Sequence, residues 1–275
     1  MARTHERPQR VWDGVVRNSV REIGVHGGSW LAPDKAQRPL AGDVESRVGS
    51  IWNEAGFNST SRPSVIGRIG AELSFEFPDS TFHVADVPLK IAGQHKFAVP
   101  KEIAALTDFL QTCVNYEAAI NPEWPSYFAF LTAHRALVAE GGLMRIGGAH
   151  SDSIQGPRIV PKRPIEHAYL ACDSTPPRFF EHCFDLGNLR SDTDDLGPTI
   201  SALADTARSF VPAEDEIVLF DAYCIHEAQP AFRAGVRTFI RLTMSTREFD
   251  REGNTLNRMI DCPWVNRARP LPPFG

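Results

Sequence analysis

Three side chains of the kinds that bind metal ions stand out by their spacing: His150 and Asp152, two residues apart, and His226 much later in the chain. In a β-strand, residues i and i+2 point to the same side, so this imidazole and this carboxylate can reach one ion from one strand end. His226 ends a predicted strand of its own. Two histidines and one carboxylate leave three adjacent coordination positions open, which is the ligand set of non-haem Fe(II) oxygenases. The alternative is a surface turn without a metal.

A cationic strand follows the second histidine, over Arg237–Ser245. Arg237, Phe239 and Arg241 share one face of it by the period of two. Phe239 favours burial of that face, and a buried guanidinium needs an anion. The planar guanidinium fork suits a carboxylate, which it binds through two parallel hydrogen bonds. The alternative is an outward face whose arginines form ion pairs at the surface.

Together these residues resemble the Fe(II)/2-oxoglutarate-dependent dioxygenases over about residues 143–245, whose pattern is His-x-Asp, a long insert, a second His and then an Arg. Here Arg237 follows His226 by eleven positions. The resemblance implies a double-stranded β-helix core, iron held by His150, Asp152 and His226, and 2-oxoglutarate and O₂ as co-substrates. It also places Arg237 on the distal carboxylate of 2-oxoglutarate.

The resemblance leaves the role of Arg241 open. Arg237 and Arg241 repeat an Arg-x-x-x-Arg arrangement similar to that of the taurine dioxygenase branch, in which Arg241 would face the substrate or share the carboxylate. The pattern of other branches would instead make Arg241 and Thr243 the anchor. Asp152 stands where halogenating relatives carry Gly or Ala, so oxygen insertion or desaturation is expected rather than halogenation.

Weaker candidates surround this set. Tyr169 lies on a predicted core strand and would hydrogen-bond 2-oxoglutarate; a half-buried core tyrosine is the alternative. His26 is a candidate substrate contact, whereas His134 and His167 are expected to be structural. A Gly- and Pro-bearing loop after the first ligands forms a lid or a substrate rim, or else a solvated charge cluster. Its polar residues are Gln155, Arg158, Lys162 and Arg163.

The elements expected to position these residues are two helices followed by many short strands. The helices are predicted over Lys101–Ala119 and Trp124–Ala139, the second ended by Gly141-Gly142. A further helix is predicted at Thr199–Ser209. Strands are predicted at Leu73–Phe77, Phe82–Lys90, Leu143–Gly148, His167–Cys172, Arg178–Phe184, Glu216–Phe220, Ala222–His226 and Arg237–Ser245. The pattern favours a mainly β fold with flanking helices and a jelly-roll, cupin-like core.

The 275 residues suit one domain, 1–275, with supporting elements in 1–142, the jelly-roll core in 143–247 and an irregular tail in 248–275. The net charge of −5 argues against a nucleic-acid partner. Five scattered cysteines without Cys-x-x-Cys argue against disulfides and a zinc knuckle. No signal peptide or membrane span is visible, so a cytoplasmic location is expected.

The sequence therefore predicts an Fe(II)- and 2-oxoglutarate-dependent oxygenase that hydroxylates, or desaturates, a small polar metabolite or natural-product intermediate. Two alternatives stay open. One is a cupin-like metal oxygenase or isomerase that uses no 2-oxoglutarate and does not need a buried Arg237. The other is a non-catalytic β-sandwich binding protein with a vestigial site.

Overall fold

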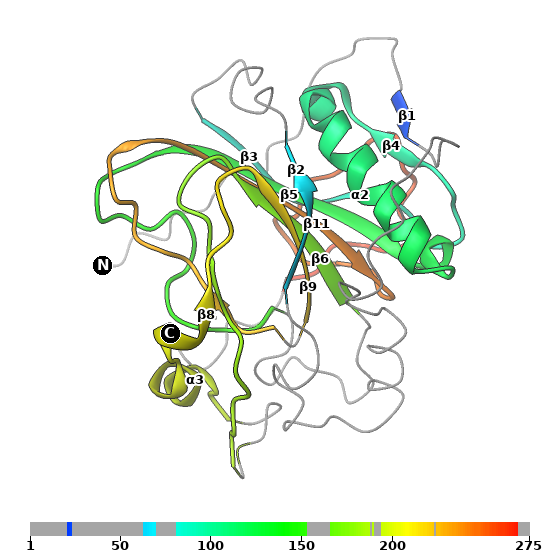
Figure 1. The fold of residues 1–275 in the computed structure, drawn as a ribbon. Coiled ribbons are helices and arrows are strands. Elements are labelled where there is room, and N and C mark those ends of the chain that lie inside the picture. Colours follow the sequence, from blue (N-terminus) through cyan, green and yellow to red (C-terminus); the bar gives the residue numbers. More distant parts are fainter. Residues whose placement is uncertain are drawn as a thin grey trace, which may run out of the picture.

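The computed structural model describes residues 21–23, 63–69, 81–152, 166–187, 189, 194–222 and 224–268. Within these ranges the chain is mainly β, with two antiparallel sheets that face each other and a few helices outside them (Figure 1). None of the helices described here is long and apolar enough to cross a membrane.

The larger sheet has six strands in the order β2-β9-β6-β11-β5-β3. Their bounds are β2 Ser64–Arg68, β3 Phe82–Lys90, β5 Phe128–Val138, β6 Glu166–Cys172, β9 Glu216–Asp221 and β11 Gly235–Ser245. Every neighbouring pair is antiparallel. β11 lies at the centre, paired over its whole length with β5 and over seven residues with β6. The strand that carries the two predicted arginines is therefore held on both sides.

The smaller sheet has the order β10-β7-β8, with β7 at Arg178–Phe180, β8 at Ser209–Phe210 and β10 at His226–Glu227. An isolated antiparallel bridge joins His150 to His226 at the edge of this sheet. A separate two-stranded sheet pairs β1, Arg21–Ile23, with β4, Phe97–Val99.

The order in which the chain visits the two sheets defines the topology. It runs from β5 in the large sheet to the His150 bridge in the small one, and back to β6. It then passes through β7 and β8 in the small sheet, β9 in the large, β10 in the small and β11 in the large. Antiparallel strands wound in this alternation form a jelly roll. The predicted mainly β fold with a double-stranded β-helix core is confirmed.

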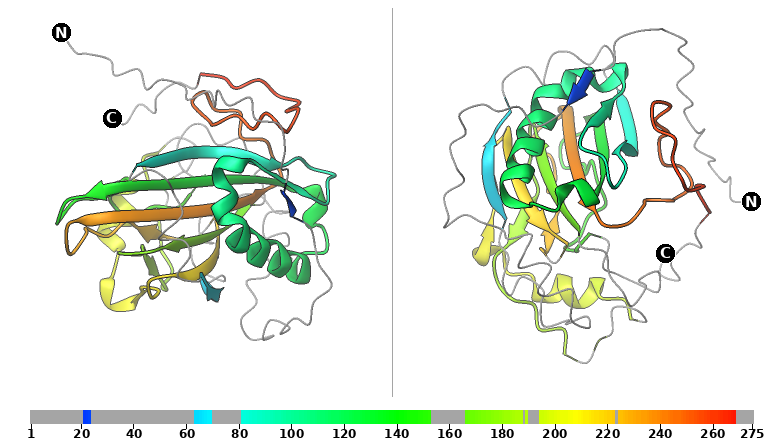
Figure 2. Two further views of the ribbon diagram at one scale, coloured as in Figure 1. Left: turned by 90° about the horizontal axis from the view of Figure 1, so that it is seen from above. Right: turned by 90° about the vertical axis from the view of Figure 1, so that its right-hand side faces the viewer.

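Helices cover the outer face of the large sheet. A 3₁₀ helix η4, Lys101–Leu106, leads into α2, Thr107–Ile120. The apolar side of α2 packs on alternate residues of the sheet, among them Leu131 of β5 and Leu242 of β11. Figure 2 shows α2 on this side of the sheet. The remaining helices are η5 Trp124–Ser126, α3 Gly197–Leu203 and η6 Thr206–Arg208.

The space between the two sheets has its own apolar cluster. Phe179 of β7 and partly buried Phe210 of β8 meet Phe220 of β9 and Phe239 of β11 there. Ile240 and Leu242 of β11 instead belong to the outer cluster under α2. The prediction that Arg237, Phe239 and Arg241 share the inward face of their strand is therefore confirmed.

Three predicted elements are wrong, one of them the strand at Ala222–His226, whose described residues before His226 form no strand. The helix expected over Trp124–Ala139 is the short η5 followed by strand β5. β5 lies between β11 and β3, and its residues 129–133 are buried on both faces, so the apolar residues there do not alternate and their pattern resembles that of a helix. The strand expected at Leu143–Gly148 is a series of turns, and Gly148 has the left-handed φ of +88°.

Other predicted elements agree in part. The helix predicted at Lys101–Ala119 corresponds to η4 and α2, and the one at Thr199–Ser209 begins earlier and is divided into α3 and η6. The strand predicted at Arg178–Phe184 ends at Phe180, and His226 begins a strand instead of ending one. The strand predicted at Leu73–Phe77, His26, and the loop residues 155–163 lie outside the described residues.

Candidate metal centre

The structure brings His150, Asp152 and His226 together at the edge of the small sheet. One potential ligand atom of each lies within 4.8 Å of the others. Reciprocal backbone hydrogen bonds of 2.9 Å between His150 and His226 fix the two histidines side by side, with ring centroids 4.7 Å apart. Asp152 follows on the turn after the bridge, with its Oδ2 3.8 Å from Nε2 of His226. Among the described residues, no other group of His, Cys, Asp and Glu side chains has this spacing.

Backbone carbonyls orient both imidazoles. Nδ1 of His150 lies 2.7 Å from the carbonyl oxygen of Gly148, and Nδ1 of His226 lies 3.1 Å from that of Cys224. A carbonyl only accepts, so Nδ1 of each ring carries the proton and donates it. The lone pair of each ring is thereby left on Nε2. Metal-binding histidines are usually held in this way by their second nitrogen.

The charge state of the cluster also suits a cation. Burial and, to a smaller extent, the neighbouring His150 lower the pKa of His226 to about 4 against the opposing effect of Asp152, so the ring is neutral at pH 7. Burial alone would raise the pKa of Asp152, but Arg241, His226 and His150 together outweigh burial and hold that pKa well below its usual range. The neutral imidazole of His226 and the carboxylate of Asp152 are of the kinds that bind ferrous ion in such enzymes.

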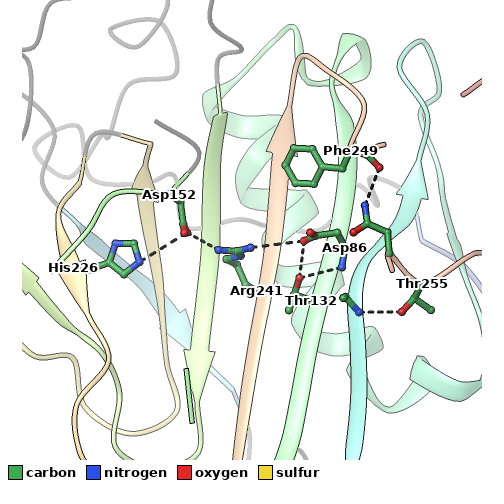
Figure 3. A network of polar contacts seen from close by, with 9 residues as sticks. Asp86, Thr132, Asp152, His226, Arg241, Phe249 and Thr255 are labelled. Carbon is green, nitrogen blue, oxygen red and sulfur yellow. Dashed lines mark hydrogen bonds and ion pairs between the residues drawn. The ribbon is translucent and has the colours of Figure 1, made fainter. Parts of the chain in front are cut away.

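Arg241 links the cluster to the edge of the large sheet. Its Nη1 donates to Oδ2 of Asp152 at 2.5 Å, and its Nη2 lies 3.7 Å from Oδ1 of Asp86 on β3 (Figure 3). Thr132 of β5 holds Asp86 in turn: its hydroxyl donates to Oδ1 at 2.7 Å and accepts from the backbone N–H of Asp86 at 3.1 Å. One guanidinium therefore serves two carboxylates.

The backbone around Asp86 is unusual. Asp86 has a left-handed φ of +45°, and the pairing of β3 with β5 shifts register between Val84 and Val87. Such bulges redirect side chains and occur often beside active sites, and aspartate tolerates the left-handed region better than most residues. Sequence reasoning missed Asp86, since it treated Phe82–Lys90 as a regular strand.

Arg237 is buried on the inner face of β11, and only 3% of its surface is exposed. Its Nε donates to the carbonyl oxygen of Ser174 at 3.0 Å, and its Nη2 donates to that of Thr175. Nη1 is buried and has no hydrogen-bond partner among the residues that the structure describes. A buried cationic N–H group without a partner is costly, so this atom is suited to an anionic oxygen that the chain itself does not supply.

Arg145 is a second residue that sequence reasoning missed. It comes from the turns before His150, and its guanidinium lies 4.9 Å above the ring centre of Phe239, between the positions of Arg237 and Arg241 on β11. Burial lowers the pKa of Arg145, and the like charge of Arg241 lowers it further. Among the described residues Arg145 forms no ion pair. The only available signal was an arginine five residues before His150, which is weak.

Tyr169 and His167 lie on the other face of the sheet. Their side chains point toward α2, where the hydroxyl of Tyr169 donates to Oε2 of Glu117 at 2.6 Å and Nε2 of His167 lies 2.7 Å from the same oxygen. Asn121 donates to the other carboxylate oxygen at 2.7 Å. The structure thus places Tyr169 in a buried network with Glu117, apart from the histidine cluster. His134, on β5, makes an edge-to-face contact with His83.

Comparison with known proteins gives structural neighbours only. No protein-family model matches the sequence, and no curated protein matches it. The similar solved structures include 2-oxoglutarate/Fe(II) oxygenases. EvdO2 from Micromonospora carbonacea var. aurantiaca, solved with 2-oxoglutarate, is 11% identical, with 72% of this chain and 93% of that one covered and a TM-score of 0.43.

Two further neighbours have similar names. A 2OG-Fe(II) oxygenase family oxidoreductase from Burkholderia pseudomallei is 14% identical, with 75% of this chain and 94% of that one covered and a TM-score of 0.36. A prolyl-4-hydroxylase from Pseudomonas putida is 17% identical, with 55% and 71% covered and a TM-score of 0.31. Function is therefore inferred below from the side chains of this chain and not from these likenesses.

Proposed function

We propose that this protein is an Fe(II)- and 2-oxoglutarate-dependent oxygenase. The observation that supports this best is the convergence of His150, Asp152 and His226, with both Nδ1 atoms engaged by the backbone and both Nε2 atoms left for a metal. Bound Fe(II) and 2-oxoglutarate would supply the oxidation of an unactivated C–H bond by O₂, with succinate and CO₂ as co-products.

Arg237 is the residue proposed to hold the distal carboxylate of 2-oxoglutarate. Its buried Nη1 offers an N–H that no atom of the described part of the chain accepts. Arg241 is less suited to this role, because its guanidinium already contacts the carboxylates of Asp152 and Asp86. The sequence leaves open whether Arg237 or Arg241 binds this carboxylate, and these contacts favour Arg237. In this proposal Tyr169 has no contact with the co-substrate, since its hydroxyl is bound to Glu117.

The apolar lining would protect the reaction. The rings of Phe179 and Phe220 lie 5.6 Å and 5.1 Å from the ring of His226, centre to centre, and both are almost fully buried. They would exclude water from the side of a bound metal on which His226 lies. A dry, shaped cavity of this kind is the usual contribution of a protein to metal-based oxidation.

The proposed substrate is a small polar metabolite or natural-product intermediate, and the proposed outcome is hydroxylation or desaturation. A cytoplasmic location remains part of the same proposal. A screen of small metabolites with Fe(II), 2-oxoglutarate and ascorbate would identify the substrate. A product heavier by one oxygen atom would indicate hydroxylation, and a product lighter by two hydrogen atoms would indicate desaturation.

The first test does not need the substrate. Under anaerobic conditions, wild-type protein with Fe(II) should develop a charge-transfer absorption band when 2-oxoglutarate is added, because the keto acid chelates the bound ferrous ion. His226→Ala should lose the band and the Fe(II) binding, whereas Glu248→Gln, an exposed residue outside the site, should keep both. Fe(II) binding without the band would favour a cupin-like enzyme. No Fe(II) binding at micromolar concentration would favour a binding protein.

A further inference from the structure

A pocket of about 350 Å³ lies between strand β3 and the C-terminal segment, residues 246–268. β3 contributes Asp86 and Pro88, and the segment contributes the other lining residues. Figure 2 shows this segment, orange to red, running outside the sheet. The volume is within the range of small-molecule sites.

Aromatic side chains form one wall. Phe249 lines the pocket and stacks on Phe130 of β5, with ring centres 4.3 Å apart and an angle of 6° between the planes. Trp264 lines it as well and packs edge-on against the same Phe130 at 6.1 Å. The two rings are held by a buried residue of the sheet, so they form a fixed surface for a planar apolar group.

The polar part of the pocket is dominated by Asp86, the only charged residue among those that line it. Asn254 and Thr255 are engaged in the protein itself: the amide of Asn254 donates to the carbonyl of Phe249, and the hydroxyl of Thr255 accepts from the N–H of Ala85. Asp86 receives Thr132 and Arg241 on Oδ1, and a quarter of its side chain is exposed. Asp86 lines the pocket, and its described side-chain contacts all involve Oδ1, so Oδ2 can accept a hydrogen bond from a ligand.

The pocket adjoins the metal centre through one side chain. Arg241 contacts Asp86 with one nitrogen and Asp152 with the other, and Figure 3 shows Arg241 between the two carboxylates. A molecule seated against Asp86 would therefore lie one guanidinium away from a residue of the candidate iron site. The bulge and left-handed backbone at Asp86 aim its carboxylate to this junction.

We propose that this pocket binds a ring-bearing part of the enzyme's substrate, with the ring against Phe249 and Trp264 and a hydroxyl or amine group of the substrate donating a hydrogen bond to Asp86. The inference rests on the proposed function only in identifying the ligand as a substrate. The binding itself does not require the metal. A ring that carries a carboxylate is disfavoured, because the pocket presents a carboxylate of its own and Arg241 is already shared by two.

The test uses three probes with the same phenol ring: tyramine, p-cresol and 4-hydroxyphenylacetate. Binding to the full-length, metal-free protein is followed by fluorescence of Trp264, with Trp264→Phe identifying its signal among the five tryptophans, and independently by line broadening of the probe in NMR spectra. Tyramine should bind about tenfold or more tightly than 4-hydroxyphenylacetate, with p-cresol between them, since a hydrogen bond to a charged acceptor is worth roughly a factor of ten or more.

Asp86→Asn is the decisive variant. Asparagine tolerates the same backbone conformation and still accepts from Thr132, so the fold is kept while the charge and the acceptor toward the pocket are lost. The preference for tyramine should then disappear, whereas Glu248→Gln removes a charge of the same sign outside the pocket and should leave it unchanged. Trp264→Ala should weaken the binding of all three probes, measured by NMR line broadening.

Several outcomes would overturn the proposal: no probe broadened by wild-type protein, a preference for the carboxylate, or a preference for tyramine that persists in Asp86→Asn. A pocket already filled by another part of this chain or by a second copy would give the first of these outcomes. These results are separate from the fate of the proposed function, because probe binding is measured without iron, and the charge-transfer band is measured without probe.

Discussion

Arg241 donates a 2.5 Å hydrogen bond from Nη1 to Oδ2 of Asp152, the carboxylate that completes the candidate iron site. Its guanidinium is almost enclosed, and the two carboxylates beside it raise its own pKa against the effect of burial. A group that holds a metal-binding carboxylate in place normally shares in the affinity for the metal.

Arg241→Gln should therefore weaken Co(II) or Mn(II) binding by about ten- to a hundredfold, because Asp152 would lose its orientation. Calorimetric titration of the metal-free protein measures this directly. Arg68→Gln, which removes an exposed ion pair with Glu216, is the matched control and should change little. Tighter metal binding in Arg241→Gln would mean that repulsion by the guanidinium outweighs its positioning of Asp152.

Arg237→Gln should raise the dissociation constant of 2-oxoglutarate by about ten- to a hundredfold, the usual effect of losing a charged hydrogen bond. Metal affinity should stay close to that of the wild type, because Arg237 has no contact with the three metal-binding residues. The anaerobic absorption titration with 2-oxoglutarate gives the first value, and calorimetry gives the second. Arg233→Gln, at an exposed position, is the control. An unchanged dissociation constant would exclude Arg237 as the anchor.

Arg145→Met should stabilise the protein without its co-substrate. Arg145 is partly buried beside the like charge of Arg241, and methionine keeps the contact with Phe239 without that repulsion. An increase of about 2–4 °C in the melting temperature corresponds to one kcal/mol in a chain of this size. Addition of 2-oxoglutarate should raise the melting temperature of the variant less than that of the wild type. If Arg145→Met has the melting temperature of the wild type, and 2-oxoglutarate raises it by the same amount, Arg145 has no role in anion binding.

The stability of the protein should depend on pH through Glu117 and His167. Burial opposes both charges, but the mutual attraction and hydrogen bond, together with smaller effects of other neighbours, outweigh it, so the pKa of Glu117 is lowered and that of His167 is raised. His167 therefore stabilises the fold fully below its unfolded pKa of about 6.5, and this contribution is lost as pH rises through its raised value. Glu117 contributes above about 4.3 and loses its effect as pH falls through its lowered value.

Urea unfolding measured at several pH values above 6.5 tests the direction of this pH dependence. The free energy of unfolding of the wild type should decrease as the pH rises, and His167→Gln should remove that slope while lowering stability at pH 6. His134→Gln serves as a comparison, since that histidine lies on the other face of the sheet. A slope that survives in His167→Gln would assign the pH dependence to other groups.

The residues of the candidate site could be predicted from the sequence better than the elements that position them. His150, Asp152 and His226 were singled out by residue type and spacing, and the inward face of β11 followed from strict alternation around Phe239. The expected reason for the convergence was different, however: no strand leads into His150, and the two histidines meet through a backbone bridge that joins residues far apart in the chain.

The missed features depend on tertiary context. β5 was mistaken for a helix because both of its faces are buried, and a period of two is then invisible. The role of Asp86 arises from a bulge and a positive φ, neither of which has a signal in a stretch that reads as an ordinary strand. Tyr169 could not be assigned to a face of the sheet, since all seven residues of β6 are buried.

The carbonyl groups of Gly148 and Cys224 have one more consequence. They orient both rings before any ion arrives, so a simple set of two nitrogen donors and one carboxylate is in place in advance. Simple ligand sets of nitrogen and oxygen bind Zn²⁺, Ni²⁺ and Cu²⁺ more strongly than Fe²⁺. Occupancy by iron is then decided by which metals the surroundings supply and keep reduced, and preparations loaded with competing ions would be inert although correctly folded.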